Sequence, residues 1–230
     1  MSKVGDIERI AQNRVVKLFQ DELKYRYLGN LEKEENNSNV DEILLTAFLT
    51  KKGYTKNQIS KALYEFYKAV NINTHDDLYQ ANKEVYSQLR YGIKVKEEAG
   101  ENKETVYLID WKNPLENDFA IAEEVTIKGV HNKRPDIVIY VIGIALGALE
   151  LKRSTVSVSE GIRQSNDNQK HIFIKPFFTT IQLVMAGQDV EGLRYAGIDT
   201  SEKYYQKWKE VSEEFNPNDS YLLELTKNVS

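Results

Sequence analysis

Three charged residues stand at the outer ends of two neighbouring apolar runs of the sequence. Asp136 precedes the first run, whereas Glu150 and Lys152 close the second. Two carboxylates can hold a hard divalent cation against a phosphate, and a nearby ammonium can orient the attacking water and offset charge in the transition state. These residue types therefore indicate hydrolysis of a phosphodiester bond, with Mg²⁺ as the expected cofactor.

The two apolar runs predict a β-hairpin. They are β-branched and aliphatic, Pro135 opens the first run, and Gly143 supplies the backbone freedom that a tight turn needs. Reversal of the chain at Gly143 would bring Asp136 to the same end as Glu150 and Lys152. The last two residues are two positions apart, so they share one face of their strand.

The three residues match the pattern P-D…E-x-K, which is short enough to arise by chance. The alternative interpretation is an ion pair at the surface of two strand ends. The surroundings favour a functional site, because the hairpin follows a predicted helix that carries Glu8 and precedes one that carries Gln164.

Composition narrows the class of protein. The chain has 230 residues, of which 41% are hydrophobic and 29% charged, and its net charge is -4. No apolar run approaches the roughly 20 residues that cross a bilayer, and the first residues do not form a secretory signal. We therefore expect a cytoplasmic protein with no membrane contact. The lack of cysteine excludes disulfides and thiolate zinc sites.

An acidic chain argues against nucleic-acid binding, but its charge is unevenly distributed. Between positions 125 and 175, eight basic residues stand against four acidic ones. The basic residues are Lys128, Lys133, Arg134, Lys152, Arg153, Arg163, Lys170 and Lys175. Lys133, Arg134, Arg153 and Arg163 are the candidates for contacts to DNA phosphates, although each alone is more often solvated surface.

Periodicity predicts an α/β protein. Helices are predicted over 6–25, 41–51, 55–70, 75–89, 157–170 and 201–215, and strands over 91–96, 104–110, 118–128, 178–186 and 193–196. The first three of these strands are expected to join the hairpin in a mostly antiparallel meander. Residues 31–89 are predicted to be a helical insertion, and its aromatic residues are expected to pack between helices rather than to stack on bases.

Together with segments 119–126, 143–154, 160–164 and 193–195, the hairpin residues resemble the N-terminal nuclease domain of the restriction (R, or HsdR) subunit of type I restriction-modification enzymes. The resemblance covers most of the chain. It implies a restriction-endonuclease-like, PD-(D/E)xK core of the RecB-like type, with a mixed, largely antiparallel sheet flanked by helices.

The resemblance also implies a function. Such domains cleave unmodified double-stranded DNA with Mg²⁺, after a downstream helicase motor has translocated the DNA with ATP, in a complex with modification and specificity subunits. The sequence contains no G-x-x-x-x-G-K-[ST] loop, so ATP is expected only in the full-length subunit. We expect a nuclease domain over 1–200 and the start of the connection to the motor over 201–230.

Residue by residue, the resemblance makes Asp136 and Glu150 metal ligands and Lys152 the catalytic lysine. Glu8 would match the acidic residue that many such nucleases carry on their first helix and would complete the metal shell. The alternative for Glu8 is an exposed glutamate that the helix dipole favours.

Gln164 matches the first residue of the Q-x-x-x-Y motif on the helix that follows the active-site strand. Asn168 stands where the tyrosine is expected, and an amide can still form a hydrogen bond there. The alternative for Gln164 is a solvated helix position.

Two other functions are compatible with the same fold. The first is a non-catalytic module that docks on DNA or on a partner subunit, in which the acidic cluster is structural. The second is another nuclease, such as a repair nuclease or a junction resolvase. A substitution of Asp136 or Lys152 separates a nuclease from a docking module, because only the nuclease would lose cleavage while still assembling.

Overall fold

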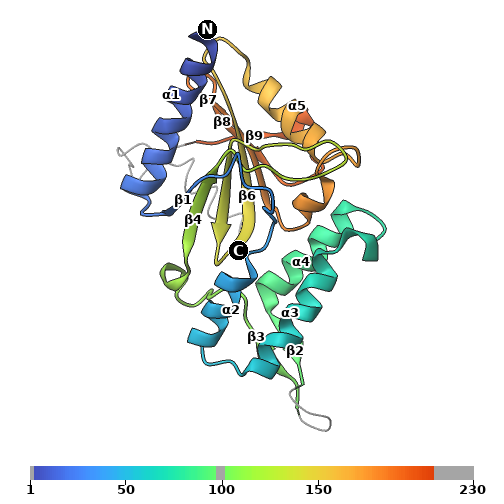
Figure 1. Cartoon of the computed structure of the whole chain (residues 1–230). Coiled ribbons are helices and arrows are strands. Elements are labelled where there is room, and N and C mark those ends of the chain that lie inside the picture. Colours follow the sequence, from blue (N-terminus) through green and yellow to red (C-terminus); the bar gives the residue numbers. More distant parts are fainter. Residues whose placement is uncertain (1–2, 97–101, 210–230) are drawn as a thin grey trace, which may run out of the picture.

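The computed structural model describes residues 3–96 and 102–209. It contains a seven-stranded sheet in the order β1-β4-β5-β6-β7-β8-β9, with helices on both faces, and a lobe at one end of that sheet (Figure 1). The helices are α1 (Lys3–Lys17), α2 (Glu42–Lys51), α3 (Lys56–Val70), α4 (Leu78–Tyr91) and α5 (Val158–Asn168). The strands are β1 (Arg26–Asn30), β2 (Ile93–Val95), β3 (Glu104–Val106), β4 (Phe119–Glu123), β5 (Ile137–Val141), β6 (Ile144–Lys152), β7 (Leu183–Gln188), β8 (Gly192–Ala196) and β9 (Gln206–Lys207).

The sheet is mixed and largely antiparallel. Neighbouring strands run antiparallel in the pairs β4-β5, β5-β6, β7-β8 and β8-β9. The pairs β1-β4 and β6-β7 are parallel. The predicted fold class, a restriction-endonuclease-like α/β core, is confirmed.

The predicted hairpin is confirmed as β5 and β6. Its turn is formed by Ile142 and Gly143, which both have positive φ values, of 53° and 76°. A two-residue turn of this kind matches the twist of the strands it joins. Gly143 also lies against the chain that enters α2, since a Cβ atom at this position would come within 2.9 Å of the Asp41 carbonyl oxygen.

The two faces of β6 are covered by different helices. Leu149 and Leu151 belong to a small apolar cluster with Val16 of α1. The opposite face packs against α5, whose Gly161 lies close to Glu150 and Lys152. Alternation along one strand thus directs the apolar residues toward α1 and the charged ones toward α5.

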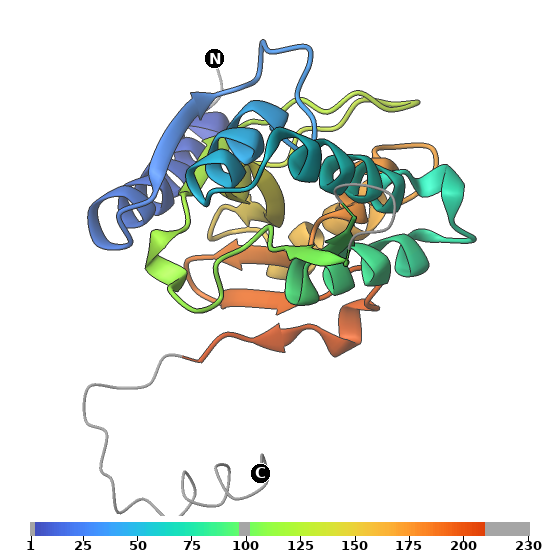
Figure 2. The ribbon, with the colours of Figure 1, turned by 90° about the horizontal axis from the view of Figure 1, so that it is seen from below.

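The lobe consists of α2, α3, α4 and the two-stranded sheet β2-β3, and it lies in front of one end of the main sheet when the molecule is seen from below (Figure 2). It has its own apolar core, which includes the fully buried Phe66 and also Ile142 and Ile144 of the hairpin turn. The buried amide of Asn82 on α4 donates to three backbone carbonyls of the core, those of Phe178, Thr179 and Ile181, at 2.7 to 3.2 Å. These contacts fix the lobe to the core.

Several predicted elements need correction. β2 and β3 pair with each other in the lobe and do not join the hairpin in a meander, because their buried side chains face α3. The strand predicted over 178–186 begins only at Leu183, after a 3-10 helix at Lys175–Thr179. The strand predicted over 118–128 ends at Glu123.

The prediction of a helix over 201–215 is wrong for the part that the structure describes, residues 201–209. Residues Glu202–Tyr204 form a 3-10 helix, and β9 follows at the edge of the sheet. The remainder of that predicted helix lies outside the described residues. The parallel edge strand β1 was not predicted, and its register with β4 is interrupted between Tyr27 and Asn30. Among the residues described, none of the helices combines the length and apolar character that a bilayer crossing requires.

Candidate active site

The structure brings the three predicted residues of the hairpin to one end of β5 and β6. Ile137 pairs with Leu149, so the preceding Asp136 stands beside Glu150 on the neighbouring strand. Oδ2 of Asp136 accepts a hydrogen bond of 2.6 Å from the backbone N–H of Leu151. This contact fixes the Asp136 carboxylate across the end of the hairpin.

The Glu150 carboxylate is buried, with a residue exposure of only 1%, and α5 contacts both of its oxygens. Nε2 of Gln164 donates to Oε2 at 2.6 Å, and Nδ2 of Asn168 donates to Oε1 at 3.0 Å. Gln164 and Asn168 are four positions apart, so they lie on one face of the helix, one turn from each other. Two amides of α5 therefore hold the carboxylate in a fixed orientation.

Lys152 is connected to the same arrangement through Gln164. Its Nζ donates to Oε1 of Gln164 at 2.6 Å, so that this single amide bridges Lys152 and Glu150. Gly161 permits the close approach of α5, because a Cβ atom there would lie 3.1 Å from Cβ of Ala186 and 3.4 Å from Cγ of Lys152. A larger residue would move the helix away from the strand end.

Burial raises the pKa of the Glu150 carboxyl well above its ordinary value, and the neighbouring Asp136 raises this pKa further. Lys152 and Lys133 act in the opposite direction, while Glu124 adds to the increase. A carboxylate at this position is therefore costly unless a cation accompanies it. The amides of α5 supply hydrogen bonds but no charge.

Glu124 is a residue near the site that the sequence analysis did not assign. It follows β4 with a positive φ of 50°, and its backbone N–H donates to the Asp136 carbonyl at 2.9 Å. Its side chain forms an ion pair of 2.6 Å with Nε of Arg134. The available signal was the pair of adjacent glutamates, Glu123 and Glu124, within the strand predicted over 118–128. Their contact with the hairpin was not predicted, because it depends on how the strands pair.

The four candidate DNA contacts differ in their surroundings. Arg134 forms ion pairs with Glu32 and Glu124, whereas Arg163 forms ion pairs with Glu160 and Glu202 on the exposed side of α5. Lys133 lies over the ring of Phe173, with Nζ 4.0 Å from the centroid. Arg153 is half-buried, and among the described residues its buried Nε has no hydrogen-bond partner.

Position 8 lies on α1, one turn before Gln12. Gln12 is buried, and its Nε2 donates to the Asp136 carbonyl at 3.3 Å. The helix is therefore in contact with the hairpin next to the candidate site. The side chain of Glu8 lies outside the described part of the chain, so its assignment as a metal ligand stays a prediction.

The donor set of the site fits a hard divalent cation that binds with incomplete protein coordination. Within the described residues, no group of three or more His, Asp or Glu side chains is gathered closely enough to enclose a metal. Asp136 and Glu150 nevertheless offer two adjacent carboxylates, one of them buried and held by hydrogen bonds. Mg²⁺ is commonly bound by one or two carboxylates, with water and phosphate oxygens as the other ligands.

The mixed sheet, with an acid pair and a lysine at the end of its central hairpin, defines the class of restriction-endonuclease-like α/β domains. The sequence model of the family described as "Type I restriction enzyme R protein N terminus" matches residues 8–203. The chain therefore belongs to this family, as the sequence resemblance predicted.

A relative from Escherichia coli, the type I restriction enzyme EcoprrI endonuclease subunit, is 33% identical to this chain over 70 residues. The aligned region covers 30% of this chain and 22% of that subunit. The similarity therefore relates this chain to a limited part of the subunit.

Proposed function

We propose that this chain is the Mg²⁺-dependent endonuclease domain of a type I restriction enzyme R subunit. It would hydrolyse phosphodiester bonds of unmodified double-stranded DNA after ATP-driven translocation by a helicase motor that lies outside these 230 residues. One observation carries the proposal. The buried Glu150 carboxylate lies beside Asp136, is held by two amides of α5, and is linked through Gln164 to Lys152. Two adjacent carboxyl groups at a buried strand end can both be ionised only beside a cation, which a bound metal ion would supply.

Asp136 and Glu150 would hold the Mg²⁺ ion between the two strand ends. Bound Mg²⁺ supplies a Lewis acid that stabilises the negative charge developing on the phosphate. Lys152 would orient the attacking water and offset charge on the phosphate oxygens, as its ammonium extends from the same face as Glu150. Gln164 positions that ammonium through the 2.6 Å hydrogen bond to its Oε1.

The basic residues near the hairpin would contact the DNA backbone. Lys133 influences the pKa of Glu150 and so lies within electrostatic range of the site. Arg153 is half-buried, so it would contact a phosphate through a guanidinium atom other than its buried Nε. Arg163 would exchange exposed ion pairs for phosphate contacts, which costs little at a solvated surface. Arg134 would keep its pair with Glu124, whose side chain is only 15% exposed, and would give up its exposed pair with Glu32.

The decisive experiment is Lys152→Ala in the full-length R subunit, assembled with modification and specificity subunits. We expect cleavage of unmodified DNA to fall by at least about 10³-fold, because charge stabilisation at the phosphate is lost. ATP-driven translocation should be unchanged. Lys170→Ala is the matched control, since this lysine lies at the end of α5 in an exposed ion pair with Asp167.

Undiminished cleavage by the Lys152→Ala enzyme would refute the nuclease assignment of this site. A docking module would give a different result, namely failure of the variant subunit to assemble or to hold DNA. Titration of the 230-residue chain with Mg²⁺, compared with Asp136→Asn, tests the cofactor separately. We expect the variant to bind the ion at least about tenfold more weakly.

A further inference from the structure

A cavity lined by aromatic and basic side chains lies in the lobe, remote from the candidate active site. Its volume is about 310 Å³, and it is enclosed by the end of α2, the end of α4 and the segment that follows β3. Its walls combine the aromatic residues Phe48, Tyr54, Tyr107 and Trp111 with three basic residues, Lys52, Arg90 and Lys112. Aromatic faces beside cations are the two components that bind single-stranded nucleic acid.

Trp111 is exposed but held rigidly. Its indole Nε1 donates to the Leu89 carbonyl at 2.8 Å, and the Arg90 guanidinium lies over the ring, 5.3 Å from its centroid. Despite these contacts, 47% of the residue is accessible to solvent, and Tyr107 beside it is 49% exposed. Two aromatic side chains thus remain open at the cavity, and one of them has a fixed orientation, which reduces the entropy lost when a ligand stacks on it.

The cavity has an excess of positive charge. Its carboxylate, Asp110, is fully engaged. Oδ2 forms an ion pair of 2.6 Å with Lys52, and Oδ1 accepts from the backbone N–H groups of Lys112 and Asn113. These contacts lower the pKa of Asp110 to about 2, with the Lys52 hydrogen bond as the largest cause. Within the described residues, Arg90 and Lys112 have no carboxylate in ion-pair contact.

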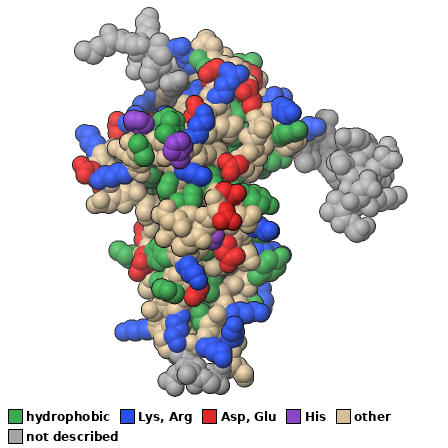
Figure 3. Space-filling view, turned by 90° about the vertical axis from the view of Figure 1, so that its right-hand side faces the viewer, with side chains coloured by type: hydrophobic (Ala, Val, Ile, Leu, Met, Phe, Trp, Pro, Cys, Tyr) green, Lys and Arg blue, Asp and Glu red, His purple; other side chains and the backbone are tan. Residues whose placement is uncertain are grey.

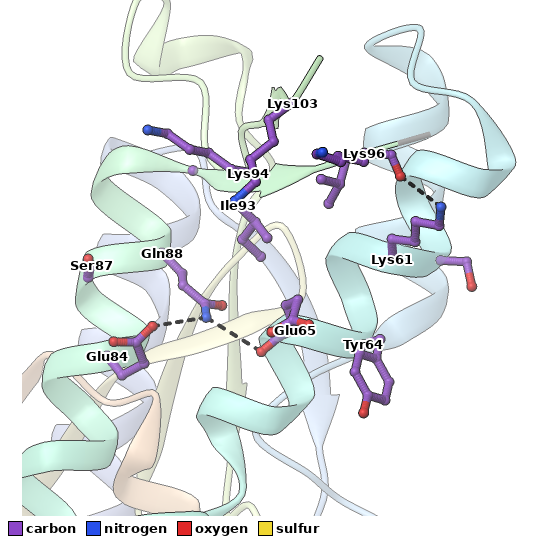
Figure 4. A pocket seen from close by; sticks show the side chains of 13 residues that line it. Lys61, Tyr64, Glu65, Glu84, Ser87, Gln88, Ile93, Lys94, Lys96 and Lys103 are labelled. Atoms are coloured by element: carbon purple, nitrogen blue, oxygen red, sulfur yellow. Dashed lines mark hydrogen bonds between the residues drawn. The ribbon is translucent and has the colours of Figure 1, made fainter. Parts of the chain in front are cut away.

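A larger groove of the lobe, of about 730 Å³, lacks these properties (Figure 4). Lysine side chains gather at this end of the molecule (Figure 3), and four of them line the groove. Glu65 and Glu84 face into it, however, and Nζ of Lys61 is engaged by the Lys96 carbonyl at 2.7 Å. Tyr64 is the aromatic residue of its lining. The smaller cavity is therefore the better candidate for an anionic, aromatic ligand.

We propose that the cavity around Trp111 binds a nucleotide of single-stranded nucleic acid. The base would stack on Trp111 or Tyr107, and Arg90 and Lys112 would contact the adjacent phosphates. Duplex DNA would bind poorly here, because its bases are already stacked on one another. Because β6 has nine residues, the active-site end and the lobe end of the hairpin are about 26 Å apart. The proposed nucleotide site is therefore separate from the candidate active site, and the inference does not depend on the nuclease chemistry.

The test uses the tryptophan fluorescence of the 230-residue chain. The sequence contains two tryptophans, so Trp208→Phe leaves Trp111 as the only tryptophan, which can be excited selectively over tyrosine. Oligothymidine of about 12 nucleotides is added in the presence of EDTA. EDTA removes divalent cations and so prevents metal-dependent cleavage, whichever residues would catalyse it. We expect saturable quenching of Trp111, because stacking of a base on an indole changes its emission.

Binding of the same labelled oligonucleotide is then compared among variants. Trp111→Ala should weaken binding by about tenfold or more, whereas Trp111→Phe should retain most of the affinity. Tyr79→Ala is the control, since Tyr79 is an exposed aromatic residue of α4 that does not line the cavity. Arg90→Ala combined with Lys112→Ala should reduce the slope of log Kd against log salt concentration by about 1.4, or about 0.7 for each phosphate contact.

Thermal unfolding of each variant excludes a loss of binding through misfolding, and the fluorescence titration, which keeps Trp111, tests the ring if Trp111→Ala does not fold. Three outcomes would overturn the proposal. One is unchanged Trp111 emission at saturating oligonucleotide. The second is equal affinity of the Trp111→Ala and Tyr79→Ala variants. The third is binding of a blunt duplex of the same length as tightly as the single strand, which would indicate contacts to the backbone alone.

Discussion

The two ends of the β5-β6 hairpin are both buried, but by opposite means. At the turn, Ile142 and Ile144 are 1% and 0% exposed and contribute apolar surface to the core of the lobe. At the other end, Glu150 is equally buried among amides and charges. Burial at the turn is favourable in itself, whereas burial of a carboxylate is unfavourable and persists only with dedicated hydrogen bonds. The turn therefore stabilises the fold, whereas the arrangement around Glu150 reduces stability and is maintained by the rest of the fold.

Among the substitutions that test this comparison, Gly143→Val at the turn should have the largest effect, which is on the stability of the fold. The substitution places a β-branched residue at a φ of 76° and directs its Cβ toward the Asp41 carbonyl, 2.9 Å away. We expect a loss of about 3 kcal/mol in the free energy of unfolding, measured with urea. Gly197→Ala is the control, because a Cβ atom at Gly197 meets nothing within 4 Å and should change stability little. A Gly143→Val protein as stable as this control would show that the turn does not organise the hairpin.

The second largest effect, on cleavage and on its Mg²⁺ requirement, is expected from Asn168→Ala at the charged end of the hairpin. The variant removes the 3.0 Å hydrogen bond to Oε1 of Glu150, so the carboxylate loses one of its two constraints. Cleavage by the full-length subunit should fall by about tenfold, and half-maximal activity should require more Mg²⁺, while DNA affinity stays the same. Asn168 is 1% exposed and donates to Glu150, so any effect of the substitution on cleavage should be transmitted through Glu150.

Asn166→Ala on the same helix provides the comparison. Its amide donates to the Thr200 carbonyl and accepts from the Tyr205 hydroxyl, away from Glu150. It should cost stability without changing the Mg²⁺ requirement. If the two variants shift that requirement equally, Asn168 has no specific effect on the carboxylate.

The smallest expected effect is on the pH dependence of the free energy of unfolding. The raised pKa of Glu150 means that, between its unfolded value of about 4.3 and its folded value, the folded state keeps a proton that the unfolded state has lost. Without Mg²⁺, the free energy of unfolding should therefore fall as pH rises through that window, by at most about 1.4 kcal/mol per pH unit from this group. Glu150→Gln should flatten the profile, whereas Gly143→Val should lower it uniformly. A profile unchanged by Glu150→Gln would contradict the assigned shift.

The hairpin could be predicted because its signals are local. Pro135 and Gly143 indicate the strand start and the turn, and the two-residue spacing of Glu150 and Lys152 places both on one face, all within one segment of the chain. The helix predicted over 157–170 begins as expected, with Ser157 as the N-cap of α5, whereas the helix predicted over 75–89 begins only at Leu78, after the N-cap Asp77. Local capping signals locate a helix start to within a turn, and the final choice depends on packing.

Pairing between distant segments could not be predicted. β1 pairs with β4 across more than ninety residues, and its own sequence lacks the alternation of a half-buried strand. β2 and β3 were identified as strands, but their sequence does not specify which sheet they join. The same limit applies to the site: residue types identified Asp136, Glu150 and Lys152, whereas the contacts of Asn168 and Glu124 depend on how the helix and the loop pack.

The edge strands of the main sheet affect how copies of this domain behave at high concentration. β9 contains only Gln206 and Lys207, both exposed, and β1 at the opposite edge loses its register beside Gly29, whose φ is 105°. A short, lysine-bearing strand and a distorted one are poor templates for a further strand from another molecule. Concentrated solutions of this domain should therefore resist association through pairing of these edge strands.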